Sequence, residues 1–159
     1  MTDITANIWL SWESTTTVTN ILRRLLANTI VLQIKLKQFH WNVRWAHFTE
    51  LHELFDTLQW DLSGIIDDSA ERIRALWVDA PGSMKEFLDD ASIKEYPTQD
   101  TDATTMLTLL LADYETLIQE SRKDITRCVD VQDDGNADFI TATMQQYEKT
   151  AWMLRATVS

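Results

Sequence analysis

Apolar residues recur every three or four positions along four long stretches of the chain, which is the spacing that places them on one face of an α-helix. The stretches run from about 16–18 to 44, from 46 to 77, from 102 to 129 and from 136 to 157. Few segments show the alternation typical of strands, so the pattern predicts an all-α protein. The first stretch has this predicted buried face: Val18, Ile21, Leu22, Leu25, Leu26, Thr29, Leu32 and Leu36.

The links between these stretches differ in length. The first two predicted helices are joined by a short turn, and so are the last two, where Asn136 is the candidate N-cap. The middle link is long and contains Pro81 and Pro97, and between them Ser83 and Glu86 have capping-box spacing and predict a short helix over 83–90. This order predicts a four-helix bundle with one long crossover, the ferritin-like connectivity. We expect a tail over 1–15, either docked through its tryptophans or loose, and one bundle domain over 16–159.

Composition narrows the functional classes. The formal net charge of −11 argues against general binding to nucleic acid, which requires a basic surface, and suits a protein that attracts cations. No signal peptide or membrane-length apolar run is visible, and the single Cys128 fits a reducing compartment, so we expect a cytoplasmic protein without a membrane span. Seven tryptophans are more than one small core accommodates and predict subunit interfaces.

Histidines and carboxylates follow a regular spacing on the second predicted helix. His52 and Asp56 are one turn apart, and so are Asp67 and Glu71. The two pairs lie on nearly the same stripe but about 16 Å apart along the helix, whereas metal ligands lie roughly 2 Å from their ion. One helix therefore cannot bring the four groups to one ion. A second copy packed antiparallel about a two-fold axis near residues 61–62 would bring each pair opposite the other pair, twice over.

The segment from Phe39 to Arg44, with His40 and Trp41 inside it, combines with this spacing into a pattern that resembles the Dps family of ferritin-like mini-ferritins, named for a DNA-binding protein from starved cells. The resemblance covers most of the chain, including segments 80–83, 134–138 and 148–154. Trp45 stands where the family often has glycine. Residues 1–22 contain no lysine or arginine, unlike the basic tails of DNA-binding members, so DNA binding is doubtful.

The resemblance implies a hollow shell of twelve subunits that oxidises Fe(II), typically with hydrogen peroxide, and stores ferric mineral, with zinc a possible competitor. It implies that one subunit supplies three ligands and its two-fold mate supplies two: His40, His52 and Asp56 from the first, Asp67 and Glu71 from the second. It also places Trp41 and Lys37 beside the site. Asp134 and Asp138 correspond to acidic residues of iron-admitting pores, and Glu53 is a candidate for mineral nucleation.

Less specific interpretations remain. Asp67 and Glu71 alone are most typical of a solvated acidic face, and a salt-bridged face formed with Arg72 or Arg74 is another alternative. Asp134 and Asp138 also suit a helix start. A DNA-compacting shell with weak metal activity, or a plain bundle that uses its tryptophans for protein contacts, are the alternative functions. His47 fits no part of the pattern and is assigned a structural or surface role, Cys128 a buried apolar one. The chain has no Glu-x-x-His motif, which argues against the intra-bundle site of classical ferritins.

Overall fold

The computed structural model describes residues 6–8, 10–44 and 46–158, and Trp9 and Trp45, singled out in the sequence, lie outside these ranges. Within them the chain forms five α-helices and no strand, so the all-α prediction is confirmed. In the same part of the chain no helix is long and apolar enough to cross a membrane. The helices are α1 (Trp12–Asn42), α2 (Phe48–Ala75), α3 (Met84–Asp90), α4 (Ala103–Asp130) and α5 (Asp134–Val158).

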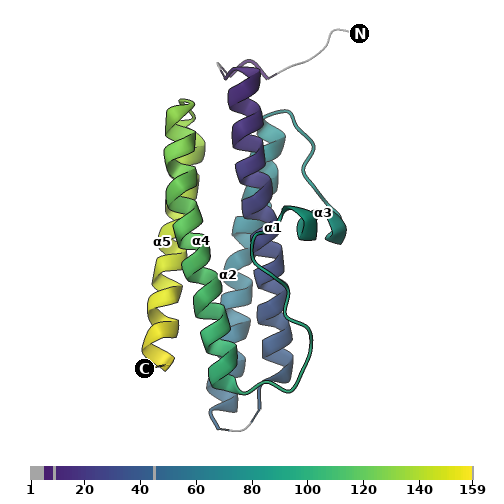
Figure 1. The fold of residues 1–159 in the computed structure, drawn as a ribbon, viewed down its shortest axis with the longest axis vertical. Coiled ribbons are helices and arrows are strands. Elements are labelled where there is room, and N and C mark those ends of the chain that lie inside the picture. Colours follow the sequence, from purple (N-terminus) through teal and green to yellow (C-terminus); the bar gives the residue numbers. More distant parts are fainter. Residues whose placement is uncertain (1–5, 9, 45, 159) are drawn as a thin grey trace.

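The four long helices form two hairpins that pack against each other. α1 packs along α2 and α4 packs along α5, with α1 also touching α4 and α2 touching α5 (Figure 1). The long connection from α2 to α4 carries the short α3, which lies against α1. The predicted ferritin-like bundle with a helix in its crossover is therefore confirmed.

Capping residues decide where the helices begin, and two predicted boundaries were wrong. α1 begins at Trp12, one turn before the expected start, because the Ser11 side chain accepts a hydrogen bond from the Ser14 backbone N–H at 3.0 Å. Part of the expected tail is thus helical. α5 begins at Asp134, because Asp133 rather than Asn136 caps it, accepting from the Asn136 backbone N–H at 3.0 Å. The capping box of α3 between Ser83 and Glu86 is confirmed.

The core lies between the two hairpins. Every residue of the predicted buried face of α1 is buried, because the helical period aligns them on one side, toward the other long helices of the bundle. At its centre Tyr114 and Tyr147 meet edge to face, with ring centroids 5.6 Å apart. The Tyr147 hydroxyl lies 3.0 Å from that of Thr29, which satisfies a buried polar group. The bundle interior is therefore filled by packed side chains and carries no carboxylate–histidine cluster among the described residues.

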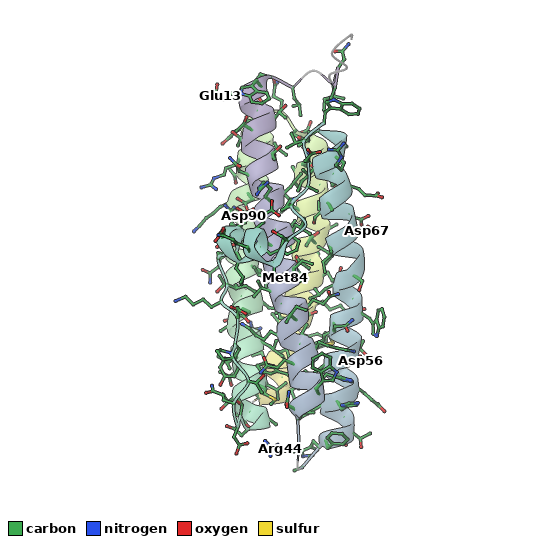
Figure 2. The ribbon with its side chains drawn as sticks, turned by 90° about the vertical axis from the view of Figure 1, so that its right-hand side faces the viewer. Glu13, Arg44, Asp56, Asp67, Met84 and Asp90 are labelled. Carbon is green, nitrogen blue, oxygen red and sulfur yellow. The ribbon has the colours of Figure 1, made fainter. Side chains whose placement is uncertain are left out.

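Polar contacts fix the crossover on α1. The Asn28 side-chain oxygen accepts hydrogen bonds from the backbone N–H groups of Ser92 and Ile93, at 2.8 and 3.2 Å. Arg23 pairs with Asp90 at 2.9 Å. These contacts hold α3 over α1, near the label of Met84 in Figure 2. The outer face of α2, which carries Asp56 and Asp67, is left uncovered.

Candidate metal centre

Two histidines close the hairpin of α1 and α2. His40 lies in the last turn of α1 and His52 in the second turn of α2, and their rings stack with centroids 3.7 Å apart. His40 Nδ1 donates to the His52 carbonyl oxygen at 2.8 Å, and His52 Nδ1 donates to the His40 carbonyl at 2.8 Å. Because a carbonyl oxygen only accepts hydrogen bonds, both Nδ1 atoms carry the proton. In the neutral ring each Nε2 therefore carries no proton and has a free lone pair, and this tautomer can bind a metal ion through Nε2.

Asp56 lies next to this pair. One of its carboxylate oxygens is 3.9 Å from His40 Nε2, and the His40 side chain is only 13% exposed while that of Asp56 is 38% exposed. The imidazole is thus held in a partly closed position with a carboxylate at its open edge. Nitrogen and carboxylate ligands with room left for an oxidant suit Fe(II), and the lack of a thiolate argues against a closed structural zinc site.

The Asp56 carboxylate forms an ion pair with a lysine. Lys37, one turn before His40 on α1, donates to Asp56 at 3.0 Å. This hydrogen bond is the main reason why the pKa of Asp56 lies below its ordinary value, and the Trp60 indole, one turn along α2, has a smaller effect in the same direction. Lys37 therefore keeps the carboxylate ionised and places a cation beside it.

Asp67 and Glu71 lie farther along α2 and are both exposed. Their neighbouring arginines pair elsewhere: Arg72 donates to the Asn136 side-chain oxygen at 2.5 Å, and Arg74 pairs with Asp79. Among the described residues, no hydrogen bond or ion pair joins either carboxylate to a partner. The alternative of a salt-bridged acidic face, formed with Arg72 or Arg74, is thus not what this chain forms.

A single chain therefore carries two separate groups of candidate ligands. His40 stacks on His52 and lies beside Asp56, whereas Asp67 and Glu71 lie farther along α2, and the rise of the eleven residues from Asp56 to Asp67 is about 16 Å. Figure 2 shows Asp56 and Asp67 at different heights on this helix. Within the described part of the chain, no three His, Cys, Asp or Glu side chains are grouped closely enough to hold a metal ion. Whatever cation binds here is incompletely coordinated by one copy of the chain.

The other residues singled out in the sequence lie away from this centre or beside it. His47 precedes α2 in a left-handed conformation (φ 63°) and lies 3.7 Å from Glu50, as expected for a surface residue. Trp41 and Glu53 are exposed, and so are Asp134 and Asp138 at the start of α5.

Cys128 is fully buried, as predicted from the sequence, and burial raises the pKa of its thiol to about 11. The contact of Trp60 with Asp56 was missed, although the spacing of four residues on one helix would have indicated it.

Comparison with known proteins identifies the fold family. The sequence model of the ferritin-like domain matches residues 19–159. An uncharacterised low temperature-induced protein of Nostoc sp. is 40% identical over 151 residues, which is 94% of this chain and 84% of the relative. DNA protection during starvation protein 2 of Bacillus anthracis is 35% identical over 139 residues, 87% of this chain and 94% of that protein.

Among solved structures, the chain superimposes on a Dps protein from Vibrio cholerae, which is described as a member of a broad superfamily of ferritin-like diiron-carboxylate proteins. The TM-score is 0.91 at 30% identity, over 98% of this chain and 97% of that one. The match extends over the whole bundle and includes the crossover. Both the domain match and these full-length relatives lead to one conclusion: this chain belongs to the Dps family of ferritin-like proteins.

Proposed function

We propose that the protein is a ferroxidase and iron store of the Dps type, which oxidises Fe(II) at sites shared between two subunits. One observation carries the proposal. His40 stacks on His52 and lies 3.9 Å from Asp56, and the carboxylates Asp67 and Glu71, without a partner in the described part of the chain, have the spacing on α2 at which an antiparallel copy would bring them opposite this group.

The ligands of the proposed site differ in how firmly they are held. The two imidazoles are fixed by their Nδ1 hydrogen bonds, so their orientation requires no rearrangement when iron binds. Asp56 must exchange Lys37 for the incoming cation, whereas Asp67 and Glu71 carry no competing partner within the described chain. Zn²⁺ uses the same imidazole and carboxylate ligands and would compete.

The redox step needs an oxidant that takes up the electrons of iron. One molecule of hydrogen peroxide accepts one electron from each of two Fe(II) ions and, with two protons, gives two molecules of water and two Fe(III). Carboxylates stabilise the Fe(III) product. Consuming peroxide and Fe(II) together prevents the formation of hydroxyl radicals, which would protect the cell from oxidative damage.

Storage requires a hollow assembly and a route into it. We propose a cytoplasmic shell of twelve subunits, with Asp134 and Asp138 lining acidic pores and Glu53 facing the mineral. The exposure of all three carboxylates in a single chain supports these roles, because each is free to face an aqueous channel or cavity. The net charge of −11 favours attraction of Fe(II) to such a surface.

Direct protection of DNA is the second candidate, because the relative in Bacillus anthracis is named for DNA protection during starvation. The charges of this chain argue against direct contact. Most of its lysines and arginines lie within 4.0 Å of a carboxylate, as in the pairs Arg23–Asp90 and Arg44–Asp100. We therefore expect no retardation of duplex DNA in a gel shift at low salt near neutral pH, and strong retardation would favour the DNA-compacting alternative.

The ferroxidase proposal is tested by removing the imidazoles. His40→Ala combined with His52→Ala should lower the initial rate of peroxide-driven Fe(II) oxidation, followed by Fe(III) absorbance, by at least about 100-fold. His47→Ala is the matched control, because this histidine is exposed and lies beside Glu50, away from His40 and His52. A double variant that oxidises Fe(II) at the unmodified rate would refute the assignment.

A further inference from the structure

The centre of the open face of α2 holds one exposed indole and one exposed glycine. Trp60 is 64% exposed, and Gly64 follows it by one turn. A methyl group added at Gly64 would find no atom within 4 Å, so nothing inside this chain requires a glycine there. Glycine in the interior of a helix weakens it, and an exposed tryptophan loses the benefit of burial. Both costs indicate that another surface covers this part of α2.

The register of the proposed antiparallel pairing decides what covers it. The pairing brings Asp56 opposite Asp67 of the partner subunit, so opposed positions on the two helices add up to 123. Trp60 is then level with residue 63 of the partner. Helical side chains lean toward the N-terminus of their own helix, and this shifts the indole toward residue 64 of the partner.

We propose that Trp60 is the knob of a knobs-into-holes contact across the two-fold axis, and that it fills a hole between Trp60, Ser63, Gly64 and Asp67 of the partner subunit. Four residues at this spacing form the hole that receives a knob from a facing helix. This inference rests on the two-fold pairing of the proposed function and names the contact at its centre.

The side chains around the hole suit an indole. Gly64 contributes no side chain, and Ser63 is small and held toward α1 by a hydrogen bond from Gln33 at 3.1 Å. The floor of the hole therefore carries little side-chain volume, which leaves room for the largest side chain. Its rim includes Asp67, a candidate iron ligand, while the same indole lies one turn from Asp56 on its own helix and favours the ionised form of that carboxylate. Trp60 would thus lie beside carboxylates of both half-sites and act as a positioning residue for them.

Cysteine trapping tests the contact. In a Cys128→Ser background, Trp60→Cys with Gly64→Cys should give a covalent dimer on a non-reducing gel after mild oxidation. Thr108→Cys with Ala112→Cys is the matched control, because these positions are exposed at the same spacing on α4, outside the proposed pairing of α2 with α2, and it should remain a single chain.

A size swap tests the shape of the hole. Gly64→Leu should raise the dissociation constant of the two-fold pair by about 30-fold, the order expected for loss of an interface anchor, and adding Trp60→Ala in the same chain should recover most of that loss. Gly64→Ala adds one methyl group and should stay within about threefold of the unmodified chain. Sedimentation over a range of concentrations measures all three.

The outcomes separate this inference from the proposed function. If the unmodified protein assembles and oxidises Fe(II), yet the pair at positions 60 and 64 does not cross-link and Gly64→Leu assembles normally, the Trp60 contact is overturned while the ferroxidase site stands. If the unmodified protein sediments as a single chain at every concentration, the two-fold site fails, and the Trp60 contact fails with it.

Discussion

Mixing two inactive variants should restore activity if each site draws its ligands from two subunits. The first variant, His52→Ala with Asp56→Ala, lacks the half-site at the start of α2. The second, Asp67→Ala with Glu71→Ala, lacks the distant carboxylates. Each alone should be inactive, because every site in a two-fold pair of identical chains then lacks one half.

The size of the recovery follows from the geometry. With random pairing of equal amounts, about half of the pairs contain one chain of each kind. In such a pair one site combines both defects, and the other combines two intact halves. About a quarter of all sites should therefore be active, and the initial rate of peroxide-driven Fe(II) oxidation should reach about a quarter of that of the unmodified protein.

The assay requires that the chains exchange, so the variants should be unfolded and refolded together or produced together. Refolding each variant separately and mixing afterwards is the control, and it should stay inactive unless subunits exchange. Failure of the co-refolded mixture to recover activity, in assemblies whose mixed composition is verified by mass spectrometry, would refute a site built across two subunits. A single chain cannot complete the site by itself, because its two groups of ligands lie about 16 Å apart along one helix.

Three further predictions concern single contacts. Lys35 and Asp113 are paired at 2.5 Å, the lysine is 5% exposed, and burial raises the pKa of Asp113. Asp113→Ala leaves the buried lysine without its partner and should lower the free energy of unfolding, measured by urea denaturation, by about 3–5 kcal/mol. Lys35→Met with Asp113→Leu removes both charges and should change this free energy far less. Lys37→Met should raise the pKa of Asp56 toward its ordinary value in an NMR titration of the metal-free protein, because the hydrogen bond that favours the ionised form is lost, and an unchanged pKa would contradict the assigned cause. Cys128 should react with a thiol reagent only after unfolding, because the side chain is fully buried and burial holds its thiol pKa at about 11.

The fold was predictable because its main signals are local. Apolar periodicity indicated the four long helices, and the capping box at Ser83 fixed the start of α3. The errors arose at two helix starts: Ser11 begins α1 before the apolar stripe starts, and Asp133 rather than Asn136 caps α5. Apolar periodicity does not locate the first turn of a helix when that turn precedes the apolar stripe, so helix starts are predicted less accurately than helix interiors.

The candidate site was predictable in its residues but not in its contacts. The stacking of His40 on His52 and their crossed hydrogen bonds depend on how α1 and α2 pack, which spacing alone does not define. The same holds for the occupation of Asp56 by Lys37, because these residues come from different helices. The routing of Arg72 to Asn136, which leaves Glu71 unpaired within the described chain, depends on a contact across 64 residues of sequence.

The crossed histidine hydrogen bonds also bear on the order in which the protein folds. They join residues only 12 positions apart, whereas the contacts that dock the crossover onto Asn28 join residues 64 and 65 positions apart. Closing a short loop costs less entropy and happens sooner than closing a long one. We therefore expect the hairpin of α1 and α2 to form, and to hold its imidazoles in place, before the crossover docks. A folding intermediate of this chain would already present half of a cation site, and metal present during folding would act on the hairpin first.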